Sequence, residues 1–160
     1  MAQLNQSNLF YDVQNAVVGI LNADESLSAV NFFAENNKAI EEEIESALRR
    51  QGICGIVMVN DAVYQGRYQG EATVWQIDKL TVQVVENVPV NRANNNPKYV
   101  GTCQDVAYAA AEKLGGAASP YRSQFQLMDY SCGEDQSLLV SKVTFKCLAQ
   151  TENNLSSNTQ

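Results

Sequence analysis

The sequence of 160 residues contains no histidine. That absence excludes a Ser-His-Asp triad, a Cys-His pair, a histidine-ligated metal and imidazole acid–base catalysis. Charged residues are scarce too, at 18% of the chain against about 25% in an average protein. Neutral amides replace them, because the chain has 16 asparagines and 14 glutamines. Enzymes that work through imidazole are excluded, and an amide-rich surface is expected.

Basic residues are few and scattered. The chain has 11 Lys and Arg against 18 Asp and Glu, which gives a net charge of −7. Since phosphate affinity comes mainly from Lys and Arg, this balance argues against a free-standing nucleic-acid binder. No apolar run approaches the ~20 residues that cross a bilayer, and the first residues lack the pattern of a secretory signal. We therefore expect a protein that is made and kept in the cytosol, with no membrane partner.

The four cysteines are Cys54, Cys103, Cys132 and Cys147, and they include no C-x-x-C pair. Their wide spacing argues against a zinc site, and a cytosolic location argues against a disulfide framework. We interpret three or all four of them as small buried hydrophobes, because free cysteine is usually buried.

Motifs of catalysis and phosphate binding are also missing. The sequence has no G-x-G-x-x-G, no G-x-x-x-x-G-K-[ST] and no G-x-S-x-G. The glutamates of segment 41–45 allow two interpretations, a metal or catalytic cluster and the acidic start of a helix. The second is favoured because Arg49 and Arg50 close the same segment, in the order of charges that a helix dipole prefers. We expect no enzymatic activity, no cofactor and no metal site.

Three helices are predicted from apolar residues at helical spacing. Candidate capping residues precede each one, and glycines follow the second and third. Thr102 and Asp105 form a capping-box pattern at the start of the third helix. The predicted helices are 9–22 with Ser7 as cap, a segment that starts after Asn36 or Asn37 and ends at Arg50, and 102–114.

Strands are predicted where apolar residues alternate or form short runs. In segment 71–86 the apolar residues change from odd to even positions near Asp78 and Lys79, which predicts a β-bulge there. Segment 129–136 contains Gly133 and acids, and we predict a hairpin turn. The other predicted strands are a short extended segment at 29–33, a buried strand at 53–59, and two half-exposed strands at 121–128 and 138–148.

Two predicted loops carry candidate contact residues. Long ordered loops in compact domains are often functional, and Tyr and Arg are enriched at binding hot spots. Subunit contact and simple flexible connection both remain possible for these loops. The candidates are Tyr64, Arg67 and Tyr68 in segment 60–70, a protruding loop or hairpin tip, and Arg92, Lys98 and Tyr99 in the loop 91–101.

The predicted elements define an α+β fold. We expect a mixed, mainly antiparallel sheet with about three helices packed on it. Sixteen strand residues from 71 to 86 reach about 50 Å at ~3.3 Å per residue. That exceeds the needs of the domain, so one long strand or hairpin should protrude. Residues 1–148 are expected to form a single domain and residues 149–160 a flexible polar tail.

The layout resembles the tail terminator proteins of tailed bacteriophages and the related tail-completion, or neck, proteins. The similarity runs from about residue 8 to 148. The most telling local match is VVENVPVNR at 84–92, which a loop and the helix DVAYAAAEKLGG follow. The other similar features are an opening helix that ends in LNADESLSAV, a Glu-rich helix that leads through RRQG into ICGIVMVN, and a closing pair of strands.

The resemblance implies a structural virion protein of the phage tail or neck, assembled in the host cytoplasm. Tail terminators form a hexameric ring that caps the tail tube, stops its polymerisation and joins the tail to the head. The implied partners are other copies of the chain, tail-tube proteins, sheath proteins in contractile tails, and neck or head-completion proteins. DNA would pass through the ring without specific binding, and we expect an acidic lumen to repel it.

Two alternatives stay open beside the terminator. One is another phage component: a neck, head-completion, tube or sheath protein, which copy number per particle would separate. The other is a small cytosolic enzyme or ligand-binding domain, which predicts a deep pocket with convergent polar groups.

Overall fold

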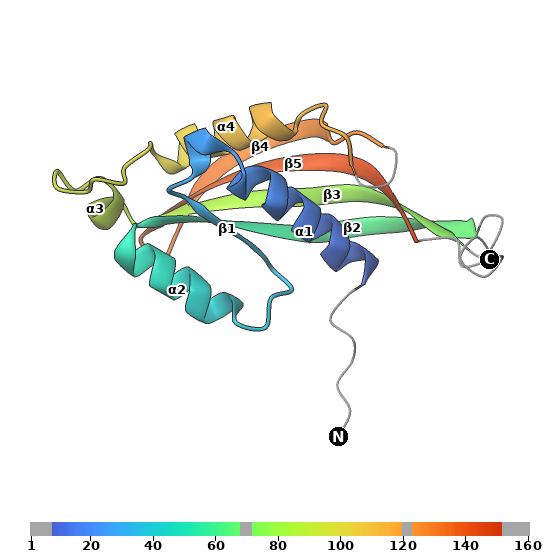
Figure 1. Ribbon diagram of the computed structural model, residues 1–160, viewed down its shortest axis with the longest axis horizontal. Coiled ribbons are helices and arrows are strands. Elements are labelled where there is room, and N and C mark those ends of the chain that lie inside the picture. The colour runs from blue at the N-terminus through green and yellow to red at the C-terminus, as the bar shows by residue number, and fades with distance from the viewer. Residues whose placement is uncertain (1–7, 68–71, 120–122, 152–160) are drawn as a thin grey trace, which may run out of the picture.

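The computed structural model describes residues 8–67, 72–119 and 123–151. Within these ranges, five strands form one mixed sheet and four α-helices pack on it (Figure 1). The predicted α+β class is therefore confirmed, with one helix more than expected. The additional helix is short, and it begins with Pro89 in its first turn, where proline is well tolerated. The helices are α1 Leu9–Asn22, α2 Ile40–Arg50, α3 Val88–Asn91 and α4 Cys103–Leu114, with a 3₁₀ turn η1 at Glu25–Leu27.

N-terminal capping agrees with the sequence at α4 only, whereas the predicted glycine after α2 is confirmed: Gly52 follows the C-cap residue Gln51 with a positive φ. Thr102 and Asp105 form the predicted capping box. At α1 the cap is Asn8, whose side chain accepts the Tyr11 N–H, and not the predicted Ser7, which lies outside the described residues. At α2 the N-cap position holds an alanine, without a side-chain capping bond. Neither of the two predicted asparagines therefore caps α2. The glutamates in the first turn of α2 and the arginines in its last turn complement the helix dipole, as predicted.

The sheet has the strand order β1-β2-β3-β5-β4. β1 pairs parallel with β2, and the remaining neighbours are antiparallel. The mixed, mainly antiparallel sheet that was predicted is therefore confirmed. The strands are β1 Asn31–Ala34, β2 Ile53–Arg67, β3 Thr73–Glu86, β4 Gln126–Asp135 and β5 Leu138–Gln150.

The predicted bulge in the long strand is confirmed. β3 pairs with β5 through Ile77 and then Leu80, so that two β3 residues stand where β5 supplies one. Ile77 and Leu80 are both fully buried although one position is odd and the other even. The extra residue lets both halves of the strand turn their apolar side chains toward the same core.

Two turn assignments from the sequence are wrong. Segment 60–70 was predicted as a protruding loop or hairpin tip; it does belong to a hairpin, but residues 60–67 are not its turn, because β2 continues through them to Arg67 and pairs with β3. Segment 129–136 was predicted as a hairpin turn, but it belongs to β4, and the turn lies at Gln136 and Ser137, which have positive φ. Pairing with a long neighbouring strand outweighed local turn propensity in both segments.

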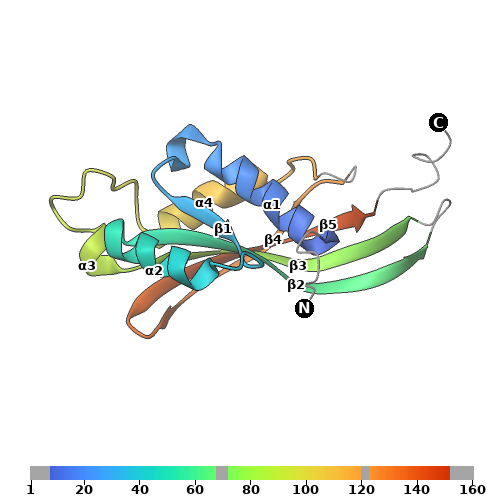
Figure 2. The ribbon, with the colours of Figure 1, turned by 60° about the horizontal axis from the view of Figure 1, so that its bottom comes forward.

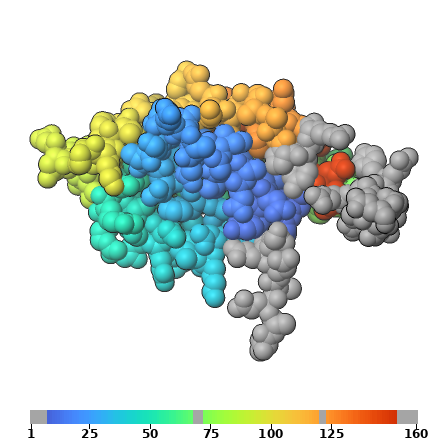
Figure 3. Space-filling view, viewed as in Figure 1, coloured from blue at the N-terminus to red at the C-terminus, as the bar shows by residue number. Residues whose placement is uncertain are grey.

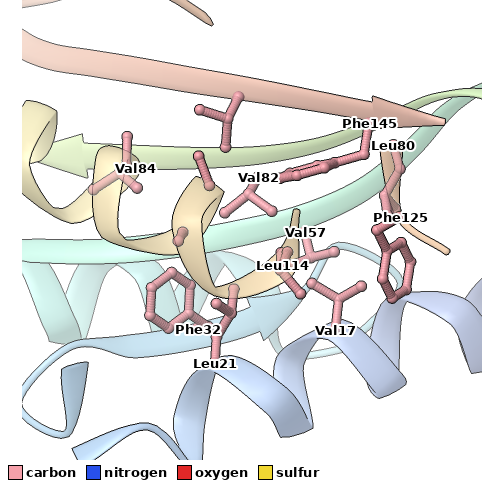
Figure 4. Packing of buried hydrophobic residues seen from close by; sticks show 14 of the residues in the cluster. Val17, Leu21, Phe32, Val57, Leu80, Val82, Val84, Leu114, Phe125 and Phe145 are labelled. Atoms are coloured by element: carbon pink, nitrogen blue, oxygen red, sulfur yellow. The ribbon is translucent and has the colours of Figure 1, made fainter. Parts of the chain in front are cut away.

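α1 and α4 cover one face of the sheet. Val17 and Leu21 from α1 and Leu114 from α4 meet the buried side chains of the central strands (Figure 4). Phe145 from β5 and Phe125 from the segment before β4 are also fully buried in this cluster. α2 lies on the opposite face, where its partly buried apolar residues pack on a smaller cluster made of Ile56, Val85 and Val140.

Gly52 joins α2 to β2 where no other residue fits easily. Its φ of +81° is in the left-handed region, and an added Cβ would lie 2.3 Å from the backbone nitrogen of Asn91. Its carbonyl also accepts the Asn87 N–H at 2.7 Å. The absence of a side chain therefore allows the α3 segment to lie against the start of β2.

Gly52→Ala is expected to cost about 2 kcal/mol of unfolding free energy, because it adds backbone strain to a steric clash. Gly19→Ala is the matched control: Gly19 is in an exposed position of α1, and a Cβ there meets nothing within 4 Å. Alanine at that site should stabilise the protein by about 0.5–1 kcal/mol. Urea unfolding followed by circular dichroism measures both changes. Equal effects of the two substitutions would contradict the close packing at Gly52.

Candidate functional site

The predicted contact residues lie at opposite ends of the molecule. Tyr64 and Arg67 are exposed residues near the end of the hairpin formed by β2 and β3, while Arg92, Lys98 and Tyr99 follow α3 at the other end (Figures 1 and 2). Tyr68 lies outside the described residues. The two groups therefore do not form one site, and the molecule offers two separate ends for contact.

The hairpin of β2 and β3 projects beyond the helices as an arm (Figure 2). We define the arm as residues 60–67 of β2 with the β3 residues that pair with them. The ring of Trp75 makes edge contacts with the rings of Tyr64 and of Phe10 in α1, at centroid distances of 5.2 and 5.3 Å. These contacts join the arm to α1, while Tyr64 remains 49% exposed and Val63 47% exposed. The arm therefore presents apolar side chains to solvent.

The other end is organised by a buried carboxylate that the sequence analysis did not single out. Glu86, the last residue of β3, has no exposed surface. Its oxygens accept Asn91 Nδ2 at 2.7 Å, Arg92 Nε at 2.9 Å and the Cys103 backbone N–H at 3.0 Å. One carboxylate thus ties together the end of β3, the end of α3 and the first residue of α4.

These bonds determine the charge state of Glu86. Burial alone would raise the pKa of Glu86. Hydrogen bonds from Arg92, Asn91 and the Cys103 N–H, together with the Arg92 charge, lower it by more, and the net pKa is about 2. The Arg92 guanidinium makes a second bond to the carboxylate at 3.0 Å, and this pairing raises the pKa of the arginine. Arg92 therefore has an internal structural partner, which the prediction of a contact role did not anticipate.

The segment after α3 stands out at one end of the molecule (Figure 3). Asn91 Nδ2 donates to the Gly101 carbonyl at 3.0 Å, and Asn96 Nδ2 donates to the Asn91 carbonyl at 2.9 Å, so both ends of the segment are fastened. Between these bonds Lys98 is exposed and Tyr99 is 46% exposed. Lys98 and Tyr99 are thus presented on a fastened loop.

A second surface was missed by the sequence analysis. The half-exposed strand was predicted at 121–128, but β4 runs from Gln126 to Asp135 and all ten of its residues are exposed. β4 is the last strand in the order of the sheet. An apolar groove of about 650 Å³ lies between β4 and α4, and Tyr108, Leu127, Met128 and Tyr130 line it. Tyr108 is the most exposed of them, and Glu112, which accepts its hydroxyl, raises the pKa of that phenol.

Three of the four cysteines behave as buried hydrophobes, as predicted. Burial raises the pKa of Cys54 to about 12 and that of Cys147 to about 11, and burial also raises the pKa of Cys103. Cys132 on β4 is exposed. Only this last thiol is accessible among the described cysteines.

The described residues contain no group of three or more Cys, Asp or Glu side chains arranged to hold a metal ion. In the same part of the chain, none of the helices combines the length and the apolar character that a membrane crossing requires.

Comparisons with known proteins add a likeness of fold. No protein-family model matches the sequence, and no curated protein matches it. Among solved structures, the fold is similar to a chain from the virion of a native gene transfer agent (GTA) particle. The TM-score is 0.54 at 16% sequence identity, and the match covers 87% of this chain and 95% of that chain. At this identity the likeness establishes a shared fold over nearly the whole of both chains.

Glu86 makes stability depend on acid pH. Its pKa in the folded protein, about 2, lies below its ordinary value of 4.5, so its contribution is fully present above pH 4.5 and is lost as the pH falls toward 2. That contribution is about 3 kcal/mol. Glu86→Gln should therefore lower the unfolding free energy at pH 7 and flatten its decline between pH 5 and 3.

Urea titrations at several pH values measure this effect. Glu45→Gln provides the control, since its exposed i,i+4 pair with Arg49 contributes under about 1 kcal/mol. If the wild type and Glu86→Gln lost stability in parallel between pH 5 and 3, the buried ion pair would not have the assigned role.

Proposed function

We propose that this protein is a structural component of a phage or phage-like virion, and that within this class it is a tail terminator. The observation that carries the proposal is the fold shared with a chain of the GTA virion over 87% of this sequence. The resemblance to tail terminators, drawn from the residues themselves, points independently to the same class of protein. The role is structural, and the protein acts through its surfaces rather than through catalysis.

As a terminator the protein forms a ring, with six copies as the expected number. The ring caps the tail tube, ends its polymerisation and joins it to neck or head-completion proteins, and in a contractile tail it also contacts the sheath. The two separated ends of the molecule support this proposal, because a subunit in a stack needs different surfaces for the components before and after it. Lys98 and Tyr99 are the candidate residues for contact with an adjoining component.

The proposal is tested by assembly in solution. Mass photometry of the purified protein, alone and with tail tubes from the same gene cluster, should detect a particle of about 106 kDa, six times the 17.6 kDa subunit. Added to polymerising tube subunits, the protein should shorten the tubes and appear as a cap in electron micrographs. Bovine serum albumin at the same concentration serves as the control.

Copy number separates the related possibilities. Six copies at one end of each tail support the terminator, whereas about twelve would indicate a connector layer and copies along the whole tail would indicate tube or sheath. A protein that stays monomeric with tubes present and leaves tube length unchanged would contradict the terminator role. Turnover of a small molecule by such a monomer would instead favour an enzyme.

A further inference from the structure

The last strand of the sheet presents an open edge. β4 follows β5 at the end of the strand order, and within the described residues no strand pairs with its outer side. Unpaired N–H and C=O groups along an exposed edge form a ladder readily with a strand of another chain. β4 is therefore suited to strand addition over its ten residues.

The groove beside this edge is apolar and lacks positive charge. Tyr108, Leu127, Met128 and Tyr130 line it and are 42 to 66% exposed. No Lys or Arg is among the lining residues, and the two charged ones are acids, including Glu112 of α4. An exposed apolar surface rimmed by charge is typical of a protein interaction site. Its occupant should be apolar, able to extend the sheet, and positively charged.

The arm has these properties. β1 pairs with β2 only up to Val57, so the outer side of residues 60–67 carries no strand within the described residues. Tyr64 exposes apolar surface on one face of the arm and Val63 on the opposite face. Arg67 is an exposed cation near the end of the strand. The same chain thus carries two unpaired edges of similar length, on opposite sides of one sheet, with complementary chemistry.

We propose that the arm of one copy occupies the groove between α4 and β4 of the next copy, with β2 of the first chain beside β4 of the second. Tyr64, whose side chain lies on the α1 and α4 face of the sheet, covers the apolar lining, and Arg67 faces the acids at its rim. This contact rests on the proposed ring, since it supplies the contact between subunits that such a ring requires. The partner is therefore a second copy of this chain.

Strand directions agree with a closed ring. β2 and β3 are antiparallel, β3 and β5 are antiparallel, and β5 and β4 are antiparallel, so β4 runs opposite to β2. β2 of the next copy then meets β4 in antiparallel orientation without reversal of the subunit. Val63 pairs with Gln76, and Gln76 pairs with Leu148. Leu148 lies beyond Lys146, the residue that pairs with the start of β4 at Gln126. The arm therefore reaches the groove when neighbouring copies are staggered along the strands, as strands tilted to the axis of a closed barrel are. Because the two surfaces differ, the contact is heterologous and generates a ring when its rotation closes.

Substitutions in the groove test the proposal. Leu127→Asp puts a charge into the lining at a half-exposed position, so folding is preserved while association should weaken about tenfold or more. Val100→Asp is the matched control, because Val100 is similarly exposed, at 43%, but lies in the segment after α3. Arg67→Glu should weaken association several-fold, whereas Arg67→Lys should largely retain it. Sedimentation velocity measures each association constant, and circular dichroism verifies folding.

Crosslinking tests which surfaces meet. Cys132 is exposed on β4, while the other three cysteines are buried. Val63→Cys therefore adds a second reactive thiol, on the arm. A short bismaleimide should join this thiol to Cys132 of the neighbouring copy and give a ladder up to the hexamer on denaturing gels. Cys132→Ser in the same background should abolish the ladder.

The outcomes separate this contact from the proposed function. Rings that persist with Leu127→Asp, with no crosslink between position 63 and Cys132, would overturn the arm-in-groove contact and leave the ring in place. Crosslinking that stops at the dimer would indicate a two-fold contact and would also overturn the proposal. A wild-type protein that stays monomeric even with tail tubes would overturn the terminator role and this contact together.

Discussion

The mismatch in length between strands and helices determines where the sheet of this fold lies uncovered. β3 has 14 residues and spans about 46 Å at ~3.3 Å per residue, whereas α4 has 12 residues and spans only about 18 Å at ~1.5 Å per residue. Helices of this length cannot cover the full length of such strands, and the sheet therefore extends beyond them as the arm. The outer edge of β4 is open for a second reason, because β4 is the last strand in the order of the sheet.

The sequence predicts the elements whose side chains face the core better than those whose side chains face solvent. Where residues face the core, burial selects the side chains, so the change of parity at Asp78 and Lys79 located the bulge correctly. Where residues face solvent, composition carries less information. The polar segments 60–67 and 129–135 look like loops, and they are strands because long neighbours pair with their backbones. The side chains of a solvent-exposed strand carry little information about whether its backbone is paired.

The candidate site shows the same division. The sequence indicates that Tyr64 and Tyr99 are exposed aromatic residues, and both side chains are exposed in the structure. Glu86 was recoverable in principle: after the bulge, Leu80, Val82 and Val84 point into the core, and the next even position is Glu86. A carboxylate in that register needs buried partners. Its partners, however, come from α3 and α4, and only the folded chain brings those segments together.

An unpaired strand edge exposes an isolated subunit to aggregation, and features of the sequence reduce that risk. β4 carries Asp129, Glu134 and Asp135 and no basic residue, and register shifts interrupt the arm strand between Asp61 and Gly66. Charge and irregularity both discourage indiscriminate strand pairing. With a net charge of −7, copies repel one another in most orientations, and both this repulsion and the attraction of Arg67 to acids act mainly within a Debye length of about 8 Å. In the proposed contact, the orientation that brings Arg67 to the acidic groove is therefore favoured over others, and the net charge opposes general aggregation.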